Sequence, residues 1–311
     1  MPVVRRKRSP YPVREIHRQS RGIFMQKAQR RLTLLLSAVL AFAFTMLTVT
    51  PASAAPARSN GSANRVIFIH GFAPGGEHDC SEYFRSARTH FANKGWQGNL
   101  LTFGYYAGNT NCSYNYRGSR DKSLNTVAKV FANYVHDNYS RRNIKVDVVA
   151  HSMGGLVVRA ALHHTALGTP GFPDRLYIED VATLGTPHGA TDFPCPNMWQ
   201  QCLDMEPGSP FLRSLPNTMP NSRRTGMGTD WTTVSSFDDA IVSEGSGIAG
   251  SAQHEVQYDD GIGHNELRTI RSGRYKSRIK HAARGNAWSS WTQRVSPVEQ
   301  ARLAVLFQST T

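Results

Sequence analysis

Residues 144–158 read IKVDVVAHSMGGLVV and combine the features that decide the fold. The first seven are mostly apolar and β-branched, which is typical of a buried strand. A sharp turn at Ser152 follows, and an apolar helix is predicted over 156–164. Such a turn lifts the serine hydroxyl above the sheet and directs the first helical N–H groups towards it. A free serine is a weak nucleophile, so this setting makes Ser152 a candidate nucleophile.

The turn needs small residues two positions before and after the serine, where Ala150 and Gly154 stand. The pattern is thus A-H-S-M-G-G instead of the commoner G-x-S-x-G, and alanine still meets the steric demand. A strand predicted over 65–70 ends in His70-Gly71-Phe72. We expect the N–H groups of Phe72 and Met153 to bind an oxyanion, and His70 to be a hydrogen-bonded structural residue.

Strands and helices alternate along the rest of the chain. Further strands are predicted over 99–103, 178–184, 231–236 and 256–258, and helices over 81–94, 123–139 and 297–307. The last helix has Ser296 as N-cap, Pro297 at its first position and Glu299 to complete a capping box. Residues 191–224, rich in Pro, Gly and Asn, are expected to form an inserted loop region. The alternation predicts an α/β fold, a mostly parallel sheet with helices on both faces.

The first 54 residues have the pattern of a secretory signal peptide. Ten Lys and Arg residues precede an uncharged run at 32–50, and Ala52-Ser53-Ala54 offers a cleavage site. A retained membrane anchor is the alternative, since the run is about long enough to span a bilayer. Met25 would start a signal of more ordinary length. We expect a signal peptide over 1–54, cleaved near Ala54, and one folded domain over 55–311.

Charge and cysteine usage narrow the function classes. Residues 1–54 hold ten of the 36 basic residues and one of the 22 acidic ones, so most of the basic surplus belongs to the export signal. The remaining surplus, partly at 268–284, reads as a solvated face and does not argue for nucleic-acid binding.

All four cysteines follow residue 54, and an even number in an exported chain suggests disulfides. Three pairings are open. Cys80–Cys112 and Cys195–Cys202 are favoured because each pair brackets a loop-like stretch. The cysteines show no zinc-binding spacing.

Four segments in order, VIFIHGF (66–72), AHSMGG (150–155), LGTPHG (184–189) and DAIV…GIGH (239–264), resemble the secreted bacterial lipases of the α/β-hydrolase superfamily. The likeness is greatest to the class 2 lipases of Gram-positive bacteria, in which the alanine variant of the turn also occurs. It covers about residues 65–270 and implies that 55–311 is an α/β-hydrolase catalytic domain. The stretch 205–212 also looks like a segment near the active site of such enzymes. The last forty residues match no family segment.

The resemblance implies the chain order serine, acid, histidine for a catalytic triad. His264 stands in a glycine-flanked context similar to that of the family's catalytic histidine, and His254 is the alternative. The acid is expected just after the strand 231–236, where Asp238 and Asp239 are adjacent. Asp239 opens the D-x-I/V-V run typical of the family, so Asp239 is preferred.

These features predict a secreted carboxylic ester hydrolase, a triacylglycerol lipase or esterase that works through an acyl-enzyme. It needs no metal or organic cofactor, binds lipid or ester small molecules, and is expected to be a monomer. The sequence does not decide whether calcium is bound or whether residues 191–224 form a lid. Alternatives are a short-chain esterase, phospholipase or acyltransferase on the same triad, or an inactive cell-envelope binding protein. Six apolar residues lie near the expected site: Phe72, Phe193, Met198, Trp199, Met205 and Phe211. Two interpretations of this set are open, a surface for a lipid substrate and ordinary packing of loops.

Overall fold

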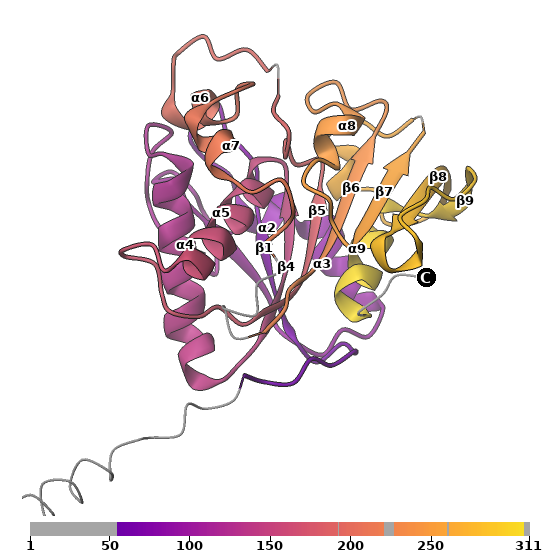
Figure 1. Cartoon of the computed structure of the whole chain (residues 1–311), viewed down its shortest axis with the longest axis horizontal. Helices are drawn as coiled ribbons and strands as arrows, with labels where there is room; N and C mark the ends of the chain where they lie inside the picture. Colours follow the sequence, from indigo (N-terminus) through magenta and orange to yellow (C-terminus); the bar gives the residue numbers. More distant parts are fainter. Residues whose placement is uncertain (1–54, 192, 221–226, 260, 308–311) are drawn as a thin grey trace, which may run out of the picture. The chain divides into compact units, whose positions relative to one another are not determined.

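The computed structural model describes residues 55–191, 193–220, 227–259 and 261–307, and these belong to one compact unit (Figure 1). The expected signal peptide, its cleavage site near Ala54 and parts of the loop region 191–224 lie outside the described residues. None of the helices described is both long and apolar enough to cross a membrane.

One sheet organises the described residues. Its strands, in spatial order β3-β2-β1-β4-β5-β6-β7-β8-β9, are parallel from β3 to β7 and antiparallel from β7 to β9. The strands are β1 (Arg65–Ile69), β2 (Leu100–Gly104), β3 (Tyr114–Asn115), β4 (Val146–His151), β5 (Ile178–Leu184), β6 (Asp230–Ser236), β7 (His254–Tyr258), β8 (Arg274–His281) and β9 (Thr292–Val295).

Helices cover both faces of the sheet (Figure 1). One apolar layer joins β1, β4 and β5 to α4 and α5, and a second joins β1, β6 and β7 to α3 and α9. The central strands β4 and β5 are buried along their whole length, as expected for parallel strands covered on both sides. The predicted α/β-hydrolase fold is confirmed. The helices are α2 (Cys80–Tyr83), α3 (Arg85–Asn93), α4 (Leu124–Asn138), α5 (Met153–Leu167), α6 (Gln200–Asp204), α7 (Pro210–Ser214), α8 (Glu244–Gly247) and α9 (Pro297–Leu306).

Two local expectations about helices need correction. The single helix expected over 81–94 is divided at Phe84, whose ring is buried against Phe68 at 5.2 Å between centroids. Helix α9 begins after Ser296 as predicted, but no capping box forms, since the Ser296 hydroxyl makes no hydrogen bond among the described residues. Glu299 instead accepts from Arg302 at 2.7 Å and contacts His90 at 2.6 Å, and hydrogen bonds to charged groups are stronger than a neutral cap.

The last strand expected from the sequence was 256–258, and the structure adds β8 and β9 beyond it. Alternate positions of β8, starting at Arg274 and ending at Lys280, carry basic side chains on one face, while Ser277, Ile279 and His281 on the other face are buried. Within the basic stretch 268–284, for which a solvated face is expected, residues 274–281 therefore form an antiparallel strand with its basic side chains on one face.

Both expected disulfides are present. Cys80 at the start of α2 is bonded to Cys112 before β3, and Cys195 is bonded to Cys202 in α6. The Cys195–Cys202 bond joins residues seven positions apart and closes a short loop. The Cys80–Cys112 bond joins residues 32 positions apart, and α2, α3 and β2 lie between them, so the expectation that this pair brackets a loop-like stretch is wrong.

Candidate active site

Ser152 lies in a strained turn between β4 and α5. Its backbone has φ 54° and ψ −135°, a region that residues with a side chain rarely adopt. The Ser152 N–H donates to the Leu184 carbonyl at 2.9 Å, and the Thr186 hydroxyl donates to the Ser152 carbonyl at 2.8 Å. The end of β5 thus holds the turn from both sides. This geometry is that of a nucleophile elbow, which exposes the serine hydroxyl above the sheet.

Glycines allow other backbone to approach the elbow closely. A Cβ atom on Gly154 would lie 2.5 Å from the Ile69 carbonyl oxygen and 2.6 Å from that of His70. A Cβ atom on Gly71 would lie 2.7 Å from the Ser152 Cβ. The small residues of the A-H-S-M-G-G pattern are therefore needed because β1 and the following loop pack directly on the turn.

Asp239 and His264 form a close pair beside this turn. His264 Nδ1 lies 2.7 Å from Asp239 Oδ2. The other carboxylate oxygen of Asp239 accepts the N–H groups of Ile241 and Val242, each at 2.9 Å, which fixes the carboxylate in orientation. The neighbouring Asp238 is turned away and accepts the N–H of Gly261.

Ser152 and His264 line the same cavity. Their side chains share no hydrogen bond in the structure, and catalytic hydrogen bonds are often long before substrate binds. Ser152, Asp239 and His264 follow the parallel strands β4, β6 and β7, so the three residues lie at the same edge of the sheet.

Two N–H groups next to Ser152 have no partner. Within the described residues, neither the Phe72 N–H nor the Met153 N–H donates a hydrogen bond. Buried backbone donors without partners are rare in folded proteins. The amide of Met153 begins helix α5, where the helix dipole adds to its attraction for a negative charge.

A polar network that no local sequence pattern marks supports the His264 loop. His151 contacts the Tyr83 hydroxyl through Nδ1 at 2.6 Å and the His264 carbonyl through Nε2 at 2.9 Å. A carbonyl can only accept, so the proton of His151 is on Nε2 and Tyr83 donates to Nδ1. Burial lowers the pKa of His151 well below its usual value, so the ring stays neutral. Tyr83 in turn accepts the Gly71 N–H at 3.1 Å, which joins the loops around Ser152.

His70 and His254 do not line the cavity at Ser152. His70 is buried, stacks on Tyr105 with 4.0 Å between centroids, and has its pKa lowered to about 3 by burial. His254, the alternative base, is the first residue of β7 and therefore lies at the amino edge of the sheet. Its ring contacts His281 at 2.7 Å and Asp230 at 3.1 Å.

The cavity at Ser152 has a volume of about 360 Å³ and mostly apolar walls. Of the six apolar residues singled out in the sequence, Phe72, Phe193 and Met205 line it. Trp199 packs on Phe72 with 5.9 Å between ring centroids. Phe211 belongs to the buried core, and Met198 is 68% exposed. Half of that set is therefore loop and core packing.

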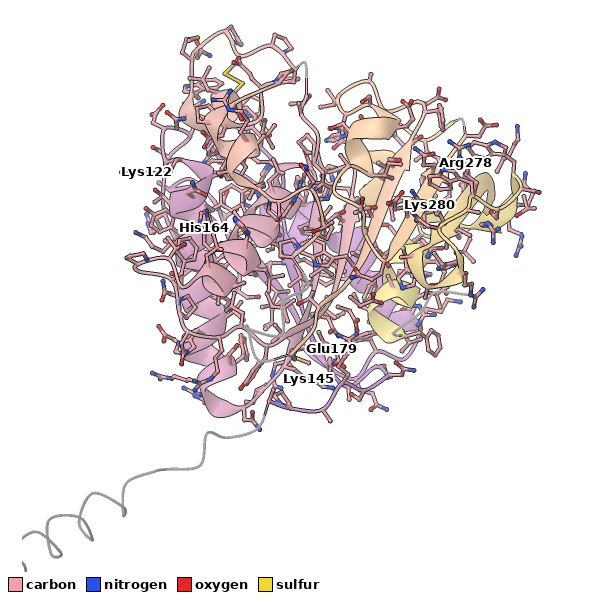
Figure 2. All side chains as sticks on the ribbon, in the orientation of Figure 1. Lys122, Lys145, His164, Glu179, Arg278 and Lys280 are labelled. Atoms are coloured by element: carbon pink, nitrogen blue, oxygen red, sulfur yellow. A yellow bond between two sulfur atoms is a disulfide. The ribbon has the colours of Figure 1, made fainter. Side chains whose placement is uncertain are left out.

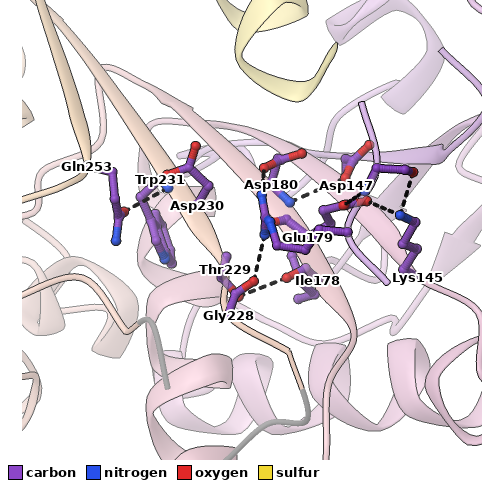
Figure 3. Close-up of polar contacts among 12 residues, drawn as sticks. Lys145, Asp147, Ile178, Glu179, Asp180, Gly228, Thr229, Asp230, Trp231 and Gln253 are labelled. Atoms are coloured by element: carbon purple, nitrogen blue, oxygen red, sulfur yellow. Dashed lines mark hydrogen bonds and ion pairs between the residues drawn. The ribbon is translucent and has the colours of Figure 1, made fainter. Parts of the chain in front are cut away.

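A second polar cluster occupies the opposite, amino edge of the sheet (Figures 2 and 3). Asp147, Glu179 and Asp180 are all buried, and their carboxylates approach within 4.8 Å of one another. Lys145 lies 2.7 Å from Glu179, and Arg58 lies 2.6 Å from Asp180. The two cations thus pair with Glu179 and Asp180 and leave Asp147 without an ion pair among the described residues. The cluster ties the start of the described chain to β4 and β5.

Replacing Asp147 by asparagine is expected to stabilise the domain at pH 8. Burial, followed by the charges of Asp180 and Glu179, raises the pKa of Asp147 well above its usual range. Burial likewise raises the pKa of Asp180 to about 7. A carboxyl group with a raised pKa in the folded state contributes its full stabilisation below the unfolded-state pKa of about 4. This contribution is lost as the pH rises through the pKa of the folded state.

The gain for Asp147→Asn should be about 1 kcal/mol or more at pH 8 and smaller at pH 5, measured by urea unfolding. Exposed Asp121→Asn serves as the control and should change little at either pH. A variant less stable than the parent at pH 8 would show that the charged form of Asp147 supports the fold.

Comparisons with known proteins agree with this architecture. Residues 60–201 match the family described as PGAP1-like alpha/beta domain. No curated protein matches the sequence. Among solved structures, the mature lipase BlEst2 of Bacillus licheniformis is similar at 16% identity and a TM-score of 0.44, covering 69% of this chain and 90% of that one.

Two further structures are similar at comparable levels. The phospholipase PlaB of Legionella pneumophila, in complex with thio-NAD, shares 14% identity with a TM-score of 0.42, over 59% of this chain and 44% of PlaB. Lipase B of Aspergillus fumigatus shares 16% identity with a TM-score of 0.41, over 70% of this chain and 49% of the lipase. The match thus spans less than half of these two proteins. The sheet and the match over residues 60–201 show an α/β-hydrolase fold, similar over that stretch to the PGAP1-like alpha/beta domain.

Proposed function

We propose that this protein is a secreted carboxylic ester hydrolase with Ser152, His264 and Asp239 as its catalytic triad. The observation that carries the proposal is the Asp239–His264 pair, whose histidine lines the same apolar cavity as the strained Ser152. Serine hydrolases need this combination of a nucleophile, a base and a residue that orients the base.

In the first half of the reaction, Ser152 Oγ attacks the ester carbonyl carbon while His264 Nε2 takes the hydroxyl proton. The carbonyl electron pair moves to oxygen, where the free N–H groups of Phe72 and Met153 stabilise the charge. The intermediate then collapses, the bond to the alcohol breaks, and His264 protonates the leaving alkoxide. Ser152 is left as an acyl ester.

In the second half, water attacks the acyl carbon and gives a proton to His264. The bond from this carbon to Ser152 Oγ then breaks, His264 returns the proton to Ser152, and the acid is released. Asp239 stays ionised throughout. Its carboxylate keeps the His264 proton on Nδ1 and stabilises the imidazolium that forms. No step requires a metal or an organic cofactor.

The substrate class follows from the walls of the cavity. Phe72, Phe193, Ile241 and Val242 offer apolar surface to an acyl chain, which favours lipid-like esters. Similar structures include lipases and a phospholipase. The signal-peptide pattern of residues 1–54 and the two disulfides support secretion, and lipid breakdown outside the cell is the resulting role.

A fluorophosphonate probe is expected to label the protein once, on the peptide that contains Ser152. The mature chain from residue 55 is incubated with the probe and mapped by mass spectrometry. Ser152→Ala is paired with Ser86→Ala, which changes a half-buried serine that does not line the cavity. Label should disappear in the first variant and persist in the second. A folded protein that takes no label, or takes it elsewhere, would contradict the proposed nucleophile.

Nitrophenyl esters of increasing chain length then separate a lipase from a short-chain esterase. A cavity with apolar walls should give a higher kcat/KM for medium or long chains than for acetate. A rate that falls steadily beyond acetate would favour the esterase alternative.

A further inference from the structure

Among the described residues that line the cavity at Ser152, one carries a permanent charge, and this charge is positive. It belongs to Arg268, and none of the described lining residues is acidic. Arg268 belongs to the short 3-10 turn Glu266–Arg268 and follows His264 by four residues, so the loop that delivers the proposed base also delivers the guanidinium. The expectation that this basic residue belongs to a solvated face is wrong for Arg268, which is half-buried.

Among the described residues, the groups that hold the guanidinium of Arg268 are neutral. Nη1 donates to the Tyr83 carbonyl at 2.6 Å and Nη2 to the Asn265 side chain at 3.2 Å, while Cζ lies 3.9 Å from the centre of the Tyr83 ring. Its Nε is buried and has no partner among the described residues. Within the same part of the chain, no carboxylate forms an ion pair with it. A half-buried charge without a counter-charge is costly, unless a ligand supplies one.

Arg268 lies only one phenol ring away from the nucleophile. A Cβ atom built on Gly71 would be 3.0 Å from the Tyr83 hydroxyl and 3.2 Å from Ser152 Oγ, so these two oxygens flank the same point. The guanidinium of Arg268 lies over the ring face of the same tyrosine, Tyr83. An ester bound at Ser152 therefore places groups a few bonds from its carbonyl next to Arg268.

His78 adds a second unused nitrogen to this wall. Its ring lines the cavity and packs on Tyr83 with 4.6 Å between centroids, and Nε2 is buried without a hydrogen-bond partner in the described residues. The backbone of Phe72 and Gly71 runs beside the ring. Burial lowers the pKa of His78 to about 4, so at neutral pH the ring is an uncharged donor or acceptor and does not compete with Arg268 for an anion.

We propose that Arg268, assisted by His78, binds a phosphate group of the substrate, so that the preferred esters are acyl esters of the glycerophospholipid kind. The proposal rests on the ester-hydrolase function above and specifies its substrate. A guanidinium fixed on an aromatic ring keeps its fork in one orientation, which suits the several acceptor oxygens of a phosphate. Arg268 is then a specificity-determining residue and takes no part in the bond-breaking steps.

The test compares two short-chain esters that differ only in the phosphate, dihexanoylglycerol and dihexanoylglycerol phosphate, both below their micelle concentrations. The ratio of kcat/KM for the phosphate-bearing ester to that for the neutral ester is measured in the mature protein and its variants. Arg268→Met should lower this ratio about 10- to 100-fold, the effect of losing a charge-assisted hydrogen bond. Most of the loss should appear in KM for the phosphate-bearing ester.

Two variants control this measurement. Arg271→Met removes an exposed arginine three residues further along, outside the cavity, and should leave the ratio unchanged. Arg268→Lys keeps the charge without the fork and should retain part of the preference. A ratio within twofold of the parent's in Arg268→Met would overturn the proposal, as would an equal loss on both esters, because Arg268 would then only hold Tyr83 in place.

Failure of the ester-hydrolase function can be told apart from failure of this inference. If the parent protein hydrolyses neither ester, the proposed function fails. Calorimetric binding of dihexanoylglycerol phosphate to Ser152→Ala, with and without Arg268→Met, then decides the phosphate site by itself. Equal affinity of the two proteins would refute it.

Discussion

Replacing Asp239 by asparagine is expected to lower kcat about 10⁴-fold with little change in stability. The side chain of Asp239 uses Oδ1 for the N–H groups of Ile241 and Val242 and Oδ2 for His264. In the variant, the amide oxygen must face the two backbone donors, so the amide NH₂ points at His264. An NH₂ group donates, which forces His264 to hold its proton on Nε2. The imidazole then has no lone pair for the Ser152 proton, although every atom keeps its place.

Asp238→Asn is the matched control, because it makes the same chemical change one residue earlier. Asp238 binds the Gly261 N–H and does not contact His264, so kcat should stay within a few-fold of the parent's. The kinetics are followed with a nitrophenyl ester, and circular dichroism verifies folding. A large loss in Asp238→Asn with a small loss in Asp239→Asn would exchange the roles of the two acids and contradict the proposed triad.

The parts of the fold that sequence predicts well are those set by local patterns. The apolar run before Ser152 becomes β4, and the predicted strand 178–184 coincides with β5 because both are buried along their whole length. Helix α4 begins after Ser123, whose hydroxyl accepts the Thr126 N–H at 3.2 Å, so its start is encoded by a cap. The strand β8 carries no apolar run, since basic residues occupy its outer face, and this explains why it was not predicted.

Sequence alone leads to candidate site residues only where a reactive side chain coincides with a recognisable local pattern. Ser152 stands at a turn whose glycines are visible in the sequence, and Asp239 and His264 follow strands in the family's order. The wall of Tyr83, His78 and Arg268 could not be found in this way. These residues come from separate segments, one of them almost 190 positions from the others, and only tertiary packing brings them together. No spacing pattern marks a contact of that kind.

Gly154→Ala is expected to destabilise the domain by about 2 kcal/mol or more and to reduce activity about 100-fold. Two effects compete at this position. Alanine favours helix by about 1 kcal/mol over glycine, and Gly154 lies in the first turn of α5. Its new methyl group, however, would sit 2.5 Å and 2.6 Å from the carbonyl oxygens of Ile69 and His70, which are backbone atoms of the central strand β1 and the loop after it. Overpacking against atoms that cannot rotate away costs more than the helix gains.

Relief of that clash must move either the elbow or the segment that leads to Phe72, and a shift of about 1 Å at reacting groups costs about 100-fold in rate.

Gly245→Ala is the matched control, because Gly245 also lies in a helix and a Cβ atom there meets nothing within 4 Å. Thermal unfolding should show a lower Tm for Gly154→Ala and an unchanged or higher one for Gly245→Ala. If Gly154→Ala fails to fold, the same steric reason requires that Gly154→Ser, which carries the same Cβ atom, also fails to fold. The parent and Gly245→Ala should both fold and take the fluorophosphonate label. A Gly154→Ala protein with parental Tm and rate would mean that β1 does not pack on the elbow as closely as the structure has it, and the steric reason for the small residues around Ser152 would be lost.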